Sequence, residues 1–155
     1  MILQLIKICK LNFDREFNLL SRIKDGKMYY SILMDSKAIY NFLRDVFKIP
    51  PGKKSHVVRV PECIRSSNKE VKYAFLHGIM ATEGGKRKRG YGMSTASITL
   101  WMDLVHLFND VGIVVKTDRW VHQTYKKEYY GLYFRTEDYS LLLSRGCRSG
   151  QTGLA

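Results

Sequence analysis

Apolar side chains recur at helical spacing in residues 71–85, which read VKYAFLHGIMATEGG. Intervals of three and four residues place side chains on one face of a helix. One such face carries apolar or small residues at Val71, Ala74, Phe75, Gly78, Ile79 and Thr82. A second apolar set lies on another side of the same helix, at Tyr73, Leu76 and Met80. A surface helix needs only one apolar stripe, so the pattern predicts a helix that is packed on two sides.

Small residues step by four along this helix, at Ala74, Gly78 and Thr82. Such a row lets a second helix approach closely, and we expect these three residues to form a helix-pairing interface. Ser67 and Glu70 have the spacing of a capping box at the start of the helix. Gly84 and Gly85 are expected to end it in a left-handed conformation.

The rest of the chain alternates between strand and helix patterns. A basic hairpin is expected from Lys86 to Thr95, followed by a helix over residues 98–111. A second hairpin is expected over residues 114–135 with its turn near residues 126–127, and Thr136 is expected to cap a last helix that Gly146 stops. Residues 68–146 therefore predict the order αββαββα in an α+β fold.

An internal repeat relates the two ends of the chain. Residues 27–36 read KMYYSILMDS and residues 127–136 read KEYYGLYFRT, an ungapped match at an offset of 100. The same offset aligns Ile8 and Leu11 with Phe108 and Val111. Within each tyrosine pair, at 29–30 and at 129–130, one ring is expected in the core and the other outside it.

The first 48 residues are predicted to repeat only the later part of the unit, as helix, hairpin and helix. Asp25-Gly26 is a strong signal for the hairpin turn, and Ser36 is expected to cap the following helix. The offset places the first copy of the 71–85 helix before residue 1. We therefore expect a partial repeat at 1–48, a linker at 49–67, a complete repeat at 68–146 and a flexible tail at 147–155.

The charge balance indicates a polyanionic partner. The 155 residues contain 26 Lys and Arg against 14 Asp and Glu, a net charge of +12. No apolar run reaches the roughly 18 residues of a membrane span, and no membrane partner is expected. Three widely spaced cysteines predict reduced thiols in an intracellular protein.

Residues 76–84, LHGIMATEG, resemble the LAGLIDADG motif of homing endonucleases, and FLHGIMATEGG is closest to intein-type archaeal members. Ala81 departs from the motif where the family name has its first Asp. The resemblance implies that Glu83 binds a divalent metal, Mg²⁺ or Mn²⁺, with the carbonyl of Thr82 as a backbone ligand. It also implies a catalytic lysine on the later strands, for which Lys116 and Lys127 are the candidates. Spacing does not choose between them and the neighbouring Lys126 and Arg135.

Basic residues on the expected hairpins are candidates for binding double-stranded DNA, because a two-stranded ribbon fits the major groove. They are Lys86, Arg87, Lys88, Arg89, Arg119, Lys126 and Lys127, with Arg22, Lys24 and Lys27 on the repeat copy.

Two functions stay open from the sequence. The first is a site-specific, metal-dependent DNA endonuclease that acts as a homodimer, in which two copies of Glu83 meet across paired helices. The second is a degenerate or non-catalytic DNA-binding protein of the same family, a regulator or maturase-like protein. An RNA-binding domain is a weaker match, because such domains present exposed aromatic residues on a continuous sheet.

Overall fold

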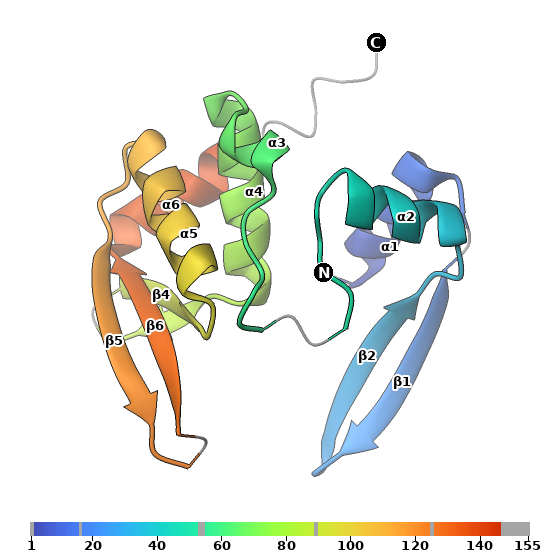
Figure 1. Ribbon diagram of the computed structural model, residues 1–155, viewed down its shortest axis with the longest axis horizontal. Coiled ribbons are helices and arrows are strands. Elements are labelled where there is room, and N and C mark those ends of the chain that lie inside the picture. Colours follow the sequence, from blue (N-terminus) through green and yellow to red (C-terminus); the bar gives the residue numbers. More distant parts are fainter. Residues whose placement is uncertain (1, 16, 53–54, 89, 125, 147–155) are drawn as a thin grey trace. The chain divides into compact units, whose positions relative to one another are not determined.

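The structure is a computed structural model that describes residues 2–15, 17–52, 55–88, 90–124 and 126–146. The predicted tail at 147–155, Cys147 and Arg89 lie outside the described residues. The chain divides into two compact units, Met1–Val46 and Phe47–Ala155. Each unit is described by itself (Figure 1).

The described residues of unit 1 form two helices and one hairpin, in the predicted order. Its elements are α1 (Ile2–Phe13), β1 (Asn18–Lys24), β2 (Lys27–Leu33) and α2 (Lys37–Asp45). Asp25 and Gly26 form the turn with positive φ of 52° and 71°, as a two-residue hairpin turn requires. Ser36 caps α2 by accepting a hydrogen bond from the backbone N–H of Ile39. The turn and the cap confirm two of the predictions for this segment.

The described residues of unit 2 form a four-stranded antiparallel sheet and four helices. The helices are α3 (Glu62–Arg65), α4 (Lys69–Thr82), α5 (Ile98–Asp110) and α6 (Thr136–Gly146). The strands are β3 (Gly85–Arg87), β4 (Gly90–Thr95), β5 (Lys116–His122) and β6 (Lys127–Phe134), in the order β3-β4-β6-β5. From α4 to α6 the element order is the predicted αββαββα, and the α+β class is confirmed.

The core of unit 2 lies between the sheet and the helices α4, α5 and α6, which stand together in Figure 1. The second apolar set of α4 is buried in this core, with Tyr73, Leu76 and Met80 at most 4% exposed. The sheet contributes the side chains of Met93, Leu132 and Phe134, and α5 and α6 contribute a further group. That group is Leu100, Leu104, Leu107, Phe108 and Leu142.

The segment before α4 is pinned to α5 by two buried polar side chains. Ser97 caps α5 and donates a hydrogen bond to the carbonyl of Val58 at 2.6 Å. Asp103 accepts a hydrogen bond from the backbone N–H of Val60 at 3.1 Å and forms ion pairs with Arg59 and Arg65. Val60 is fully buried in the core. Part of the segment expected as a linker is thus an integral part of unit 2.

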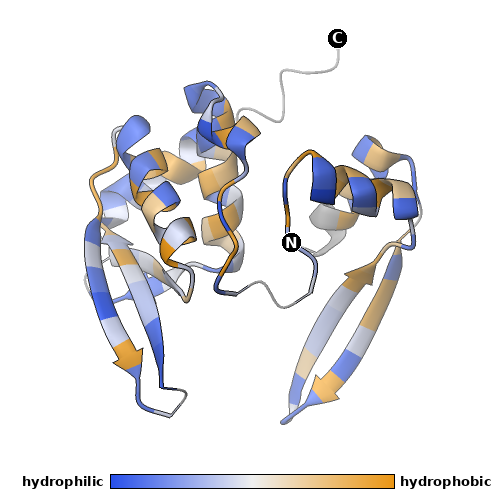
Figure 2. Ribbon diagram, in the orientation of Figure 1, coloured by the Kyte–Doolittle hydropathy of each residue, from blue (hydrophilic) through white to orange (hydrophobic). Residues whose placement is uncertain are grey.

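The hairpin of unit 1 is much more exposed than the corresponding hairpin of unit 2. Tyr130 is buried, as expected for one ring of its pair, whereas Tyr29 and Tyr30 are 43% and 49% exposed. The expectation of a core tyrosine is therefore wrong in unit 1, where β1 and β2 form a two-stranded sheet. Figure 2 shows the hydrophobic residues spread along these two strands.

The ungapped repeat does not hold across the hairpins. Lys24 pairs with Lys27 around a two-residue turn, whereas His122 pairs with Lys127 around a four-residue turn. Tyr30 consequently faces Ser21, while Tyr130 faces Arg119, two positions away from the residue that the offset predicts. Upstream, the aligned positions differ in burial: Ile8 and Leu11 are exposed, whereas Phe108 and Val111 are buried.

Three predicted helix boundaries need correction. Asn68, not Ser67, caps α4, with its side chain accepting from the backbone N–H of Val71 at 3.0 Å. Thr136 is the first residue of α6 rather than its cap. Gly84 does not have a positive φ; instead, a Cβ at this position would overlap the carbonyl oxygen of Met80. Close approach to the helix, and not handedness, accounts for the glycine.

Cys9 and Cys63 are free thiols, half-buried and exposed respectively. Among the described residues, no helix combines the length and the apolar character that crossing a bilayer requires.

Candidate metal site and nucleic-acid interface

Glu83 lies at the C-terminal end of α4, which the core holds firmly in place. The Tyr73 hydroxyl donates to the carbonyl of Val111 at 2.8 Å, and Lys72 forms an ion pair with Asp110 at 2.7 Å, so α4 is fastened to the end of α5. The backbone N–H of Glu83 still bonds to the carbonyl of Ile79 at 2.8 Å. The position of the carboxylate is therefore set by a rigid element, and the side chain is exposed.

Few groups of the described residues surround the Glu83 carboxylate. At a helix C-terminus a carboxylate is disfavoured by about 0.3–1 kcal/mol, and the structure gives the Glu83 carboxylate no hydrogen bond or ion pair with other described residues. Within the described ranges, no three His, Cys, Asp or Glu side chains gather closely enough to hold a metal ion. One carboxylate and the last helical carbonyls are an open, all-oxygen donor set. This set fits Mg²⁺, which commonly keeps several waters and takes one or two carboxylates plus substrate phosphates.

The small-residue row on α4 faces outward. Gly78 and Thr82 are exposed and Ala74 is half-buried, and a Cβ added to Gly78 would meet nothing within 4 Å. The Thr82 hydroxyl donates to the carbonyl of Gly78 at 3.1 Å, so it is turned back onto its own helix. The row is thus a low surface of small groups.

The sheet of unit 2 has a helix-covered face and an open face. Successive side chains of a strand point to opposite faces, and the buried residues Tyr130, Leu132 and Phe134 define the helix-covered face of β6. Gly131, Tyr133 and Tyr129 therefore point to the open face, as do their register partners on β4 and β5. Those partners are Gly92, Ser94, Lys116, Asp118 and Trp120.

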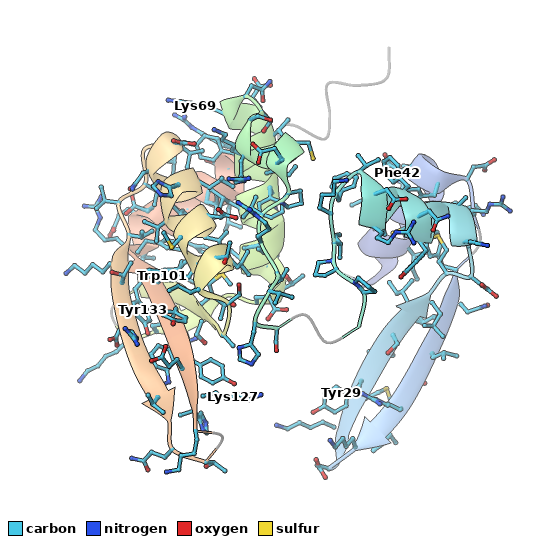
Figure 3. All side chains as sticks on the ribbon, viewed as in Figure 1. Tyr29, Phe42, Lys69, Trp101, Lys127 and Tyr133 are labelled. Atoms are coloured by element: carbon cyan, nitrogen blue, oxygen red, sulfur yellow. The ribbon has the colours of Figure 1, made fainter. Side chains whose placement is uncertain are left out.

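Aromatic rings form a row on this open face. Trp120 stacks on Tyr129 with ring centroids 6.1 Å apart and 18° between planes, and His122 lies 5.9 Å from Tyr129. Tyr133, labelled in Figure 3, extends the row toward the other end of β6. A Cβ on Gly92 would lie 2.6 Å from Tyr133 Cδ1, and one on Gly131 would lie 2.5 Å from the Tyr133 hydroxyl. The Tyr133 ring therefore lies across both glycines, which are buried beneath it.

A basic hollow of about 720 Å³ adjoins Tyr133 at the end of the sheet away from the β5–β6 turn. Four cationic side chains line it, Arg87, Lys88, Lys116 and Arg135, together with Gly90, Tyr91, Val114, Tyr133 and Phe134. Arg135 is paired with Asp138 at 3.1 Å, and this hydrogen bond raises the pKa of Arg135. The hollow thus combines positive charge with aromatic and apolar surface.

The predicted DNA-binding residues that the structure describes are all exposed. Lys86 and Arg87 lie on β3, Lys88 in the turn after it, Lys126 in the β5–β6 turn and Lys127 at the start of β6. Arg22, Lys24 and Lys27 share one face of the unit 1 hairpin with Tyr29, and the Arg22 guanidinium lies 5.9 Å from the ring of Tyr29.

Arg119 differs from the other candidates because its charge is already compensated. Its guanidinium is hydrogen-bonded to the carboxylate of Glu128, which also accepts from the Tyr130 hydroxyl at 2.7 Å. The bond from Arg119 lowers the pKa of Glu128, and the bond to Glu128 raises the pKa of Tyr130. Arg119 also pairs with Tyr130 in the strand register and so lies on the helix-covered face, which favours a structural role.

The two predicted catalytic lysines lie on strands other than β3, the strand that follows Glu83. Lys116 lies on β5, three strands from β3 and hence about 14 Å across the sheet. In the strand register, Gly85 pairs with Gly92 and Gly92 pairs with Tyr133. Lys127 lies six residues along β6 from Tyr133, which is about 20 Å. Lys86, three residues after Glu83 on β3, is nearer to Glu83 along the chain than either of them.

The sequence predicted one outward-facing ring in the Tyr129–Tyr130 pair, but the grouping of Trp120, Tyr129 and Tyr133 into a row was missed, although a signal was present. Gly92 and Gly131 interrupt strand segments, and a glycine inside a strand often marks a close approach by another group. Trp120, Tyr129 and Tyr133 also alternate with core residues at the period of two. The cross-strand pairing of Trp120 with Tyr129 depends on the four-residue turn and could not be obtained from spacing.

Solved structures of the homing endonuclease I-DmoI share this fold. A crystal structure of I-DmoI in complex with DNA and Mn matches with a TM-score of 0.59 at 15% identity, over 92% of this chain and 70% of that one. A structure from a study of mesophilic I-DmoI variants gives 0.60 at 15% identity, over 92% and 69%. An I-DmoI variant with its target DNA and Mg gives 0.62 at 16% identity, over 95% and 72%.

No protein-family model matches the sequence, and no curated protein does. The structural matches alone show that the fold is that of a homing endonuclease, and the motif resemblance at residues 76–84 agrees with it.

Proposed function

We propose that the protein is a metal-dependent DNA endonuclease of the LAGLIDADG homing type. One observation carries the proposal: an exposed carboxylate, Glu83, stands at the end of a helix fixed in the core of a homing-endonuclease fold. The intein-like motif sequence at residues 75–85 supports it. Such an enzyme would act inside the cell, where its DNA lies.

The metal would be Mg²⁺ or Mn²⁺, held by Glu83 and the carbonyl of Thr82. When bound, it would polarise a phosphate and lower the pKa of a water molecule. Glu83 would hold the metal ion beside a DNA phosphate, and the nearby cations of β3 would bind the phosphate backbone of the DNA. Structures of I-DmoI have been solved with Mn, Mg and Ca, which supports a divalent ion here.

Cutting both strands requires a second acid close to the first. We propose that a second copy of the chain supplies it, with Ala74, Gly78 and Thr82 at the helix-pairing interface. In a two-fold symmetric dimer the same patch contacts itself, and a low row of small groups suits close helix packing. The exposed row on α4 and the rigid position of Glu83 support this arrangement.

Lys116 and Lys127 are proposed to act on the DNA backbone from the open face, and Lys86 to stand nearest the metal. Replacing each lysine by Ala distinguishes a catalytic role from a contact with the DNA backbone. Loss of cleavage with unchanged binding would assign a catalytic role, whereas a parallel loss of both would assign a phosphate contact.

The decisive experiment is Glu83→Gln. We expect this change to abolish Mg²⁺-dependent cleavage of a randomised duplex library while leaving the fold and salt-dependent duplex binding nearly unchanged, because Gln keeps the shape and loses the charge. Glu137→Gln, a change at an exposed acid on α6, serves as the matched control and should cleave normally. Equal cleavage by wild type and Glu83→Gln would refute the proposal.

A non-catalytic DNA-binding protein of this fold is the second candidate. The observation that favours it is the single open carboxylate, since no three-ligand acidic cluster occurs in the described ranges. A monomer in solution that binds duplex DNA and cuts none of the library with Mg²⁺ or Mn²⁺ would establish this candidate instead.

A further inference from the structure

The open face of the unit 2 sheet carries four ring side chains, which we call the aromatic floor. Its members are His122, Tyr129, Trp120 and Tyr133, all half-buried, in sequence across β5 and β6. The helix-covered face holds the apolar core, so packing within unit 2 does not account for aromatic residues on the other side.

Tyr133 lies with one side of its ring against the backbone. The Gly131 position is close to both Tyr133 and Trp120, because a Cβ there would lie 2.9 Å from Tyr133 Cζ and 3.0 Å from Trp120 Cζ3. The absence of side chains at Gly92 and Gly131 lets the Tyr133 ring lie flat against the backbone at these two positions. A ring that lies down exposes its other side, which explains the half-buried state.

Half-buried aromatic rings on an open sheet face are suited to unpaired bases. In a duplex the bases are stacked on one another and present only their edges in the grooves. Unpaired bases present whole π-faces, and proteins bind them by stacking on aromatic side chains beside a positively charged path for the backbone.

The charge needed for such a path lies at both ends of the floor. Lys127 pairs with His122 in the strand register at one end. At the other end, Tyr133 also lines the basic hollow with Arg87, Lys88 and Lys116. A hollow that joins cations to an aromatic wall matches a nucleotide, which joins a phosphate to a base.

We propose that this face binds single-stranded nucleic acid, with bases stacked on Trp120, Tyr129 and Tyr133 and phosphates at Lys116, Lys127 and the hollow. This activity goes beyond duplex cleavage and does not require Glu83, a metal or a second copy of the chain.

The two tryptophans of the chain provide an internal test. Trp120 lies on the open face, whereas Trp101 lies on the helix side and donates a hydrogen bond from Nε1 to the carbonyl of Gly131 at 3.0 Å. Trp101→Phe leaves Trp120 as the reporter, and Trp120→Phe leaves Trp101. Both are placed in the full-length Glu83→Gln protein, without divalent metal, and titrated with oligothymidylate and oligouridylate of about 12 nucleotides.

We expect saturable quenching of Trp120 and little change in Trp101 with at least one of the two oligomers. Binding of the oligomer should weaken about tenfold in Trp120→Ala, and less in Trp120→Phe, since stacking on one ring contributes on that scale. Val121→Ala, an exposed neighbour on the opposite face of β5, is the control and should bind as wild type.

Three results would overturn the inference: no binding of either oligomer, equal quenching of both tryptophans, or equal affinity of Trp120→Ala and Val121→Ala. Binding of a mixed-sequence duplex, measured in parallel, distinguishes single-strand binding by the floor from the duplex binding of the proposed nuclease. If Trp120→Ala weakens duplex and single-strand binding by the same factor, the floor is part of a duplex site and the inference is wrong. Duplex cleavage by the wild-type protein is measured separately, and its loss in Glu83→Gln tests the proposed nuclease independently of Trp120.

Discussion

At the scale of single residues, Asp103 is the clearest example of a charge whose value is structural. Its side chain is 10% exposed, and it holds the backbone of Val60 and the guanidinium groups of Arg59 and Arg65. Removing one member of such a group leaves a buried N–H and a cation without a partner. We expect Asp103→Ala to lower the free energy of unfolding by about 2–4 kcal/mol.

Urea unfolding of unit 2 measures this loss. The matched control is Asp110→Ala, which breaks the ion pair with Lys72 at a side chain that is 49% exposed. The control should cost under about 1 kcal/mol. Equal losses in the two variants would show that the contact of Asp103 with Val60 contributes nothing special.

Glu128 gives a pH-dependent prediction. Because the hydrogen bond from Arg119 lowers the pKa of Glu128 in the folded protein below its ordinary 4.5, the folded state binds fewer protons there than the unfolded state. The stabilisation is complete above the unfolded value and is lost as the pH falls through the lowered folded pKa. Glu128→Gln should therefore melt below wild type at pH 7, and the difference should shrink as the pH falls below about 4.5.

Thermal melts of both proteins from pH 7 to pH 3 test this, with Glu137→Gln, a change at an exposed acid, as a surface control. A difference between Glu128→Gln and wild type that stays constant over this range would contradict the assigned pKa direction.

At the scale of elements, α4 and the residues that end it contain two glycines with opposite surroundings. A Cβ at Gly78 meets nothing, whereas one at Gly84 would overlap Met80. Gly78→Ala should stabilise the monomer by up to about 1 kcal/mol, because Ala favours helices. It should also weaken the proposed dimer, because the added methyl group separates the paired helices. Gly84→Ala should destabilise the monomer.

Unfolding curves at low protein concentration and sedimentation across a concentration range measure the two effects separately. A dimer of Gly78→Ala as tight as that of wild type would place the interface elsewhere.

The elements were predictable where a local rule decides them. The Asp25-Gly26 turn, the Ser36 cap and the buried Tyr73, Leu76 and Met80 face followed from turn chemistry, capping and period. The Asn68 cap was missed by one position, since both Ser67 and Asn68 are good capping residues. The two-residue shift between the hairpins was missed because the turn over residues 123–126 lacks the strong signal that Gly26 gives.

At the scale of the whole molecule, the site was only partly predictable. Glu83 and its position at a helix end followed from the motif and its spacing. The partners of Glu83 did not, because sheet order decides which cations are near, and it puts β5 three strands from β3. Likewise, a chain of net charge +12 predicts a polyanion, but only the folded sheet separates the charges that face it from those, like Arg119, that are already paired.

The last prediction tests whether the placement of charge, and not its total, governs DNA binding. Several phosphate contacts make affinity fall steeply with salt, by roughly 10³-fold or more between 50 and 200 mM for six contacts. Lys88 lines the basic hollow, whereas Lys69 is exposed at the first position of α4 (Figure 3). Lys88→Glu and Lys69→Glu change the net charge equally. Lys88→Glu should weaken binding of a mixed-sequence duplex and reduce the salt slope by about one, while Lys69→Glu should change both little. Titrations at several salt concentrations decide the matter, and identical behaviour of the two variants would mean that DNA responds to the overall charge rather than to the hollow.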